Sequence, residues 1–126
     1  MAIDPMTAVD VVRVSMQLEE ARAKVAARNI SMANVPGSHA IRFDIASAMQ
    51  MLHASLSDAD TLASAVMELN SEGVDSRIRT PSGLSTRIEL DEEVAELSSA
   101  SGRYQALADG VSRQFALMQL AVKGGK

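Results

Sequence analysis

The C-terminal quarter of the chain has the most regular pattern of apolar and polar positions. From Val94 onward, apolar or aromatic side chains recur at alternating steps of three and four residues, with one polar exception at Ser101. That spacing is typical of a helix face that packs against another helix. Because residues 91–93 are acidic and Lys123 is basic, both ends suit the helix dipole, and we predict a helix over about residues 91–123, roughly 50 Å long. Its packing residues are predicted to be Val94, Leu97, Tyr104, Val111, Phe115 and Met118.

The N-terminal third carries a second row of apolar residues with the same spacing, in which Arg28 is the one charged member. Glu20 and Lys24 lie four residues apart in the order that supports a helix. Because proline disfavours helical backbone at the residue before it, Pro36 ends the segment, and the predicted helix covers about residues 6–33. Its predicted packing residues are Val11, Val14, Leu18 and Val25.

The middle of the chain, about residues 34–90, is less regular. Apolar spacing after Phe43 predicts a short amphipathic helix, and Ser57 is placed to cap another helix that ends before Gly73. After this glycine the pattern alternates, which indicates an extended stretch or a loose hairpin formed by Arg77-Ile78-Arg79 and Arg87-Ile88-Glu89. The predicted fold class is therefore mainly α, with two long terminal helices packed as a coiled-coil-like pair and an irregular middle of short helix and extended or hairpin segments.

Both terminal helices carry more apolar surface than one helix–helix contact hides. Beside its main row, the first has Val12, Met16, Ala23, Ala26 and Ile30, and the last has Ala100, Leu107, Leu117, Leu120 and Ala121. A helix that is apolar around most of its circumference has neighbours on several sides. Two interpretations remain at this point: a subunit whose terminal helices are covered by other copies, or a monomeric bundle whose middle helices cover the extra faces. Gly102 and Gly110 favour close helix approach.

Composition narrows the function classes. The 126 residues are enough for one domain. Apolar residues make up 47% of the chain and are mostly aliphatic residues and eight Met, with only 2% aromatic residues. This composition favours helix contacts over a shaped small-molecule pocket. The net charge of −4, without a basic tract, argues against nucleic-acid binding. With no Cys, disulfides and thiolate metal sites are excluded. No apolar run approaches the roughly 20 residues of a membrane span, and no secretory signal is recognisable at the N-terminus.

No residue pattern predicts catalysis. His39 and His53 are the two histidines and have no neighbouring ligand pattern, so an ordinary surface or interface role is favoured. Asp58 and Asp60 are better explained as residues at a helix start than as a catalytic carboxylate pair. The acidic residues 91–93 lack the alternating ligands of a calcium loop. We therefore predict no enzyme activity, no catalytic residue, no cofactor and no metal.

Residues 29–38 read Asn-Ile-Ser-Met-Ala-Asn-Val-Pro-Gly-Ser. This stretch resembles the Asn-Ile-Ala-Asn-Ala-Asp-Thr-Pro-Gly-Tyr stretch of the axial proteins of the bacterial flagellum, and it departs from that stretch at Met32 and Ser38, among other positions. Its matching or closely similar residues are Asn29, Ile30, Ala33, Asn34, Pro36 and Gly37. Further along, residues 89–94 and the string Arg103, Tyr104, Gln105, Ala106 and Leu107 are similar to the family of flagellar basal-body rod protein B.

The resemblance implies one axial rod subunit spanning residues 1–126, with a structural role in the proximal rod. Such a protein leaves through the flagellar type III export apparatus without a cleaved signal peptide. It assembles helically in the periplasm with copies of itself and other rod proteins, joining the rod adaptor and the export gate at the rod base. The rod transmits torque and surrounds the export channel, and this role needs no cofactor, no nucleic acid and no direct membrane span.

Two alternatives to the rod interpretation remain. An inner-rod subunit of a related type III injectisome has paired helices too, but should lack the stretch from Asn29 to Gly37. A soluble helical adaptor or chaperone that binds a partner helix belongs to a different class of protein.

Overall fold

The computed structural model describes residues 5–55, 58–72, 78–79 and 87–124. The elements of these residues are α1 (Pro5–Met32), β1 (Arg42–Phe43), α2 (Ile45–Ala54), α3 (Ala59–Glu72), β2 (Ile78–Arg79) and α4 (Leu90–Gly124). The two long terminal helices pack against each other, and the middle of the chain is less regular. The predicted mainly α fold is therefore confirmed.

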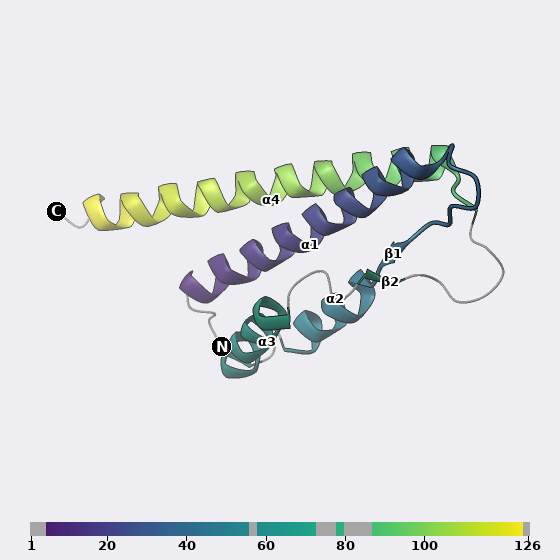
Figure 1. Cartoon of the computed structure of the whole chain (residues 1–126). Helices are drawn as coiled ribbons and strands as arrows, with labels where there is room; N and C mark the ends of the chain where they lie inside the picture. Colours follow the sequence, from purple (N-terminus) through teal and green to yellow (C-terminus); the bar gives the residue numbers. More distant parts are fainter. Residues whose placement is uncertain (1–4, 56–57, 73–77, 80–86, 125–126) are drawn as a thin grey trace.

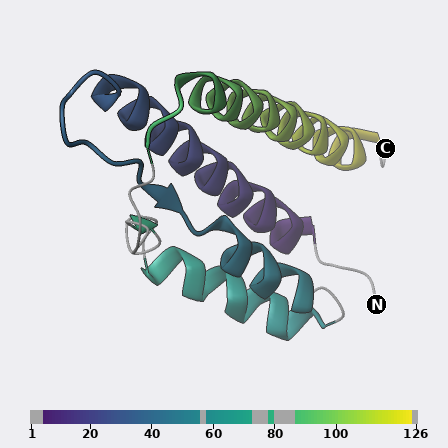
Figure 2. The same ribbon diagram turned by 90° about the vertical axis from the view of Figure 1, so that its right-hand side faces the viewer.

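The helices lie in three layers. α4 packs along one side of α1, and the pair formed by α2 and α3 lies on the other side of α1 (Figures 1 and 2). α1 and α4 run antiparallel, so that the C-terminal end of α1 lies beside the start of α4 (Figure 1). α1 is thus the central layer, covered on two sides by its own chain.

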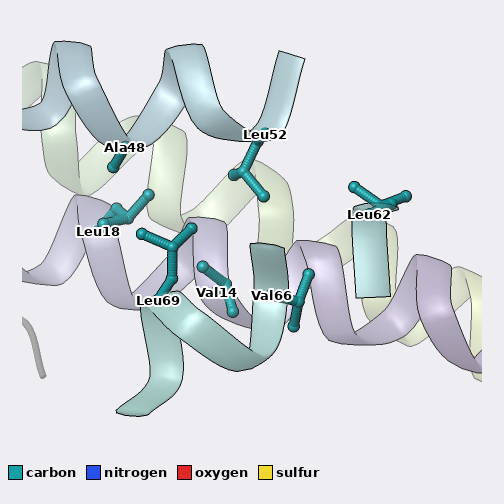
Figure 3. Close-up of a cluster of buried hydrophobic side chains, with 7 residues drawn as sticks. All are labelled: Val14, Leu18, Ala48, Leu52, Leu62, Val66 and Leu69. Carbon is teal, nitrogen blue, oxygen red and sulfur yellow. The ribbon is translucent and has the colours of Figure 1, made fainter. Parts of the chain in front are cut away.

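The apolar core lies between α1, α2 and α3 (Figure 3). Its fully or nearly fully buried side chains are Val14, Leu18, Ala48, Leu52, Leu62, Val66 and Leu69. Burying an aliphatic side chain of the size of Leu or Val contributes about 1.5–3 kcal/mol. The middle helices therefore form a stable unit with α1, and α4 lies outside this core.

Aspartates cap the two middle helices. The Asp44 side chain accepts a hydrogen bond from the Ser47 N–H at 3.2 Å, at the start of α2. At the start of α3, Asp58 accepts from the Thr61 hydroxyl at 2.7 Å and from the Asp60 N–H at 3.2 Å. The Thr61 hydroxyl is the main cause that lowers the pKa of Asp58 below its ordinary value. The predicted cap at residue 57 and the predicted stop at residue 73 lie outside the described residues.

The two short strands correct the predicted hairpin. β2 pairs antiparallel with β1, with Arg42 opposite Arg79 and Phe43 opposite Ile78. Residues 87–89 form no strand. Alternation in a sequence marks an extended segment but not its partner, and here the partner is distant because α2 and α3 bring β2 back beside β1.

Candidate assembly surface

The face of α4 that turns toward the rest of the chain is mixed apolar and polar. Most of its buried and half-buried residues follow steps of three and four, with one step of seven between Ala100 and Leu107. We call these residues the inner row: Glu93, Leu97, Ala100, Leu107, Val111, Gln114 and Met118. Three of the six predicted packing residues, Leu97, Val111 and Met118, belong to this row. They are half-buried in the isolated chain.

A second row of α4, the outer row, lies beside the inner row: Val94, Ser101, Ala108, Phe115 and Val122. Val94 is 51% exposed, Phe115 45% and Val122 81%. Tyr104, another predicted packing residue, is 37% exposed. The predicted packing residues thus divide into a group that α1 covers and a group that the described chain leaves in solvent, and the packing role of the exposed group stays a prediction.

The end of α4 extends beyond α1. Arg22 pairs with Glu96 and Glu19 with Arg103, which sets the register of the antiparallel helices. Counting equal rises back along α1, Pro5 lies level with about residues 113–117 of α4. Residues 119–124, here called the free end, project past α1, as the yellow end of α4 shows in Figure 1.

This projecting part of α4 is apolar on more than one side. Just before the free end, Leu117 is 61% exposed, and within it Leu120 is 65% exposed. From residue 97 to residue 122 only Arg103, Asp109 and Arg113 carry a charge. Contiguous exposed apolar surface with so few charges is typical of a protein interaction site.

α1 has no comparable free face. Of its predicted packing residues, Val14, Leu18 and Val25 are buried and Val11 is half-buried. In its second stripe Ala26 is buried, and the other members, Val12, Met16, Ala23 and Ile30, are half-buried. The expectation that both terminal helices lack cover holds for α4 and is wrong for α1, because α2 and α3 cover α1 on the side away from α4.

The main rows of the two long helices do not face each other. Val14 and Leu18 of the main α1 row point into the core with α2 and α3, and Val11 packs against that core. The α1 side that faces α4 carries Glu19 and Arg22 together with Ala23 of the second stripe. α1 therefore gives its larger apolar side chains to the middle helices and a partly polar side to α4.

Ion pairs join α1 to α4. Arg22 Nε donates to Glu96 Oε1 at 2.7 Å, and Arg103 Nε donates to Glu19 Oε1 at 3.0 Å. The Glu19 side chain is only 10% exposed. Removing Arg103 is costly because the buried Glu19 carboxylate loses its closest counter-charge, so this contact holds the register of the helices. Arg103, the first residue of the rod-like string, has this role in the isolated chain.

Asn29 holds the segment that follows α1. It is completely buried, and its side chain makes two hydrogen bonds to one residue: Nδ2 donates to the Ile41 carbonyl at 3.0 Å, and Oδ1 accepts from the Ile41 N–H at 3.0 Å. Arg42 continues the network, donating from Nη1 to the Ile41 carbonyl at 3.2 Å and to Glu93 Oε1 at 2.5 Å. Because Glu93 is 2% exposed, the network ties the end of α1, β1 and the start of α4 together.

The rest of the 29–38 stretch forms the turn after α1. Ala33 N–H donates to the Ile30 carbonyl at 3.2 Å, and a bond of the same length joins Ser38 N–H to the Val35 carbonyl. Gly37 has a φ of +78°, a backbone conformation that glycine adopts without steric cost. Asn34 and Pro36 are exposed. The stretch thus combines one buried clamp with a tight, solvent-facing turn.

The string that begins at Arg103 divides in a different way. Leu107 is half-buried against α1, and Gln105 and Ala106 are exposed together with Tyr104. Gly102 and Gly110 have open space where a Cβ would lie, since no other atom lies within 4 Å. Neither packing nor backbone conformation in the described chain therefore requires these small or polar residues.

Among the described residues, the side chains considered for catalysis or metal binding do not come together in one site. His39 and His53 are both exposed. In the residues that the structure describes, no group of three or more His, Cys, Asp or Glu is placed to hold a metal ion. A hollow of about 230 Å³ between α1, β1 and the start of α4 has charged walls, but Arg22 and Arg42 are there already paired with glutamates. None of the described helices is long and apolar enough to cross a membrane.

Reasoning from the sequence missed two buried glutamates that hold α4 in place. One is Glu19, which stands in the second stripe of α1 at the position between Met16 and Ala23 where the spacing calls for an apolar residue. The other is Glu93, which is four residues before Leu97 in the inner row. In both cases a charged residue inside an apolar row was the available signal. Comparison of the chain with protein-family models, with curated proteins and with solved structures found no match.

Proposed function

We propose that this chain is a structural subunit of the proximal rod of the bacterial flagellum, which assembles helically through α4. The observation that carries the proposal is the uncovered apolar surface of α4, where Phe115, Leu117 and Leu120 are each at least 45% exposed. At about 25 cal/mol per Å² of buried apolar area, covering this surface is a substantial driving force for association. Contacts between unlike faces of identical subunits build a filament when they do not close into a ring.

The division of the fold supports this role. α1, α2 and α3 share the apolar core, so they form the body of the subunit, and α4 offers one side to that body and another to neighbours. The Asn29 clamp and the Arg42–Glu93 pair hold the start of α4 against the body. A helix fixed at its base in this way can pass torque from the body of its subunit to the neighbours that it contacts, as a drive shaft requires.

The partners that go with this proposal are other copies of the chain, other rod proteins, and the rod adaptor and export gate at the base of the rod. The subunit reaches the periplasm through the type III export apparatus without a cleaved signal peptide. The resemblance of residues 29–38 and of the Arg103 string to rod proteins supports this choice over an injectisome rod subunit.

The test is made in the bacterium that encodes the chain. The protein should be present in purified basal bodies, and deletion of its gene should stop assembly before the rod and abolish swimming. Complementation with the wild-type gene is the control. A deletion strain that swims and carries complete rods contradicts the proposal, as does recovery of the protein only in a soluble complex, which is the behaviour of an adaptor or chaperone.

Alanine at Gly102 or Gly110 should have opposite effects on the subunit and on the assembly. The free energy of unfolding should rise by about 1 kcal/mol for each change, because alanine favours the helix and the added methyl group meets no atom within 4 Å. Assembly should weaken, since the methyl group separates α4 from a closely packed neighbour. Chemical denaturation and sedimentation measure the two effects.

Ser99→Ala is the matched control for the glycine variants. Ser99 is exposed on the same helix and already has a Cβ, so this change should alter both measurements only slightly. Glycine variants that stabilise the subunit and assemble as well as the wild type would show that no neighbour approaches α4 at these positions.

A further inference from the structure

Glu19 has an unused hydrogen-bond acceptor inside the α1–α4 contact. Its Oε1 accepts from Arg103 at 3.0 Å and lies 3.6 Å from Nη1 of Arg22. Its Oε2 is buried, and no donor among the described residues reaches it. A buried carboxylate oxygen without a donor is costly, and its free-energy cost exceeds that of a neutral polar group. The position therefore favours a further hydrogen-bond donor, which reaches Oε2 from outside the subunit only when the carboxylate turns out of the helix contact.

Glu19 lines a groove along one edge of the two long helices. The groove, here called the side groove, encloses about 320 Å³. Its lining residues are Glu19, Glu20, Ala23, Ser101, Tyr104 and Gln105. Ala23 and the Tyr104 ring offer apolar contact, while Glu19 and Glu20 offer negative charge. Glu20 is itself paired with Lys24 at 3.2 Å, so Glu19 is the acidic group with capacity left. Such walls fit a long basic side chain, whose methylene stem packs on apolar groups and whose head meets the carboxylate.

The chain itself carries a matching group on the free end of α4. Lys123 is exposed in the last turn, and no ion pair to another described residue is found for it. Leu120 and Val122, which accompany it, are 65% and 81% exposed. The free end is thus an apolar helix segment with a single positive charge. The side groove contains a carboxylate whose Oε1 lies near two arginines and whose Oε2 has no donor among the described residues.

We infer that the side groove of one subunit receives the free end of α4 from a second copy, with Lys123 donating to Glu19 Oε2. This inference rests on the proposed function, since it requires copies of the chain to assemble. Lys123 is twenty residues beyond the level of Arg103, so parallel copies are displaced by about 30 Å along the helix axis. The contact joins unlike surfaces, leaves a free groove and a free end at the two ends of the assembly, and therefore continues indefinitely.

Disulfide cross-linking tests the register, because the wild-type chain has no Cys. A Gln105→Cys variant places a thiol on the rim of the side groove, and a Val122→Cys variant places one beside Lys123 without removing the lysine. Equal amounts of the two full-length variants are mixed under assembling conditions and oxidised. The expected product is a disulfide-linked dimer of the two variants. Ser99→Cys, exposed on α4 but outside the side groove, replaces Gln105→Cys as the control and should give little product.

Charge variants test the role of Lys123 independently. Lys123→Glu should weaken assembly about ten- to a hundredfold, the range for losing a hydrogen bond to a charged group, and Lys123→Arg should keep it. Both variants should unfold like the wild type, because Lys123 is exposed.

The outcomes separate this inference from the proposed function. If the chain assembles but the Gln105 and Val122 variants do not cross-link above the control, or if Lys123→Glu assembles normally, the side-groove contact is wrong and the rod proposal stands. If the purified chain stays monomeric at every concentration, the inferred contact between copies is wrong. The presence or absence of the protein in basal bodies then decides the rod proposal separately.

Discussion

Phe115→Ala is expected to leave the isolated subunit almost unchanged and to abolish its assembly. Phe115 belongs to the outer row and is 45% exposed, so truncating it removes little packing from the isolated chain. In the assembly a fully buried Phe contributes much more, and its replacement by Ala costs about 3–5 kcal/mol. That loss corresponds to more than about a hundredfold in the affinity between subunits.

The other phenylalanine of the chain is the matched control. Phe43 is half-buried and packs against the core of α1, α2 and α3, so Phe43→Ala should lower the free energy of unfolding of the isolated subunit by about 2 kcal/mol or more. Chemical denaturation measures this stability, and sedimentation over a range of concentrations, with electron microscopy, measures assembly. Unfolding of the isolated subunit by Phe115→Ala, or normal assembly and normal motility with it, would each contradict the proposed role of the outer row.

The long helices are the part of the fold that the sequence predicts well. The segments 6–33 and 91–123 correspond to α1 at Pro5–Met32 and α4 at Leu90–Gly124. Their apolar spacing is regular over many turns. Pro36 shortly after the first helix and the acidic residues in the first turn of the second mark the boundaries locally. Because these signals are contained in the helices themselves, no tertiary information was needed.

Which faces meet could not be predicted in the same way. The main rows of both helices are equally apolar, so spacing alone favours their contact with each other. In the structure, Leu62, Val66 and Leu69 of α3 occupy the space beside Val14 and Leu18, and α4 takes the other side of α1. How well the side chains fill the space between helices decides between such arrangements, and the spacing of apolar residues in the sequence does not reveal this packing. Glu19 in the second stripe was one clue, since a buried carboxylate needs a basic partner such as Arg103.

Asn29 is a residue whose structural role only the structure reveals. The sequence indicates that Asn29 belongs to a rod-like stretch, but it does not distinguish Asn29 from Asn34 in physical terms. In the structure, Asn29 is completely buried and bonded to Ile41, twelve residues away, whereas Asn34 is exposed in the turn. Side chain to backbone bonds over this distance depend on where the chain returns, which local spacing does not specify.

Replacing Asn29 by Ala should therefore destabilise the subunit by roughly 3 kcal/mol. The change removes the Asn29 side-chain atoms that bond the N–H and the carbonyl of Ile41. Each poorly satisfied backbone group costs about 1–3 kcal/mol. The carbonyl keeps its bond from Arg42, which limits the loss on that side. Asn34→Ala, the same substitution in the same stretch, should stay within about 0.5 kcal/mol of the wild type because Asn34 is exposed.

The consequences of Asn29→Ala should reach α4. Without the clamp, the segment before β1 is released, and the Arg42–Glu93 contact that ties the start of α4 to the body loses its anchor. Limited proteolysis should then cut between residues 33 and 41 faster than in the Asn34→Ala variant. Asn29→Asp sharpens the test: its carboxylate still accepts from the Ile41 N–H but has no donor for the carbonyl and places a charge in a buried position, so it should be at least as harmful as alanine. Equal stability of the Asn29 and Asn34 variants would mean that the clamp does not hold the two terminal helices together.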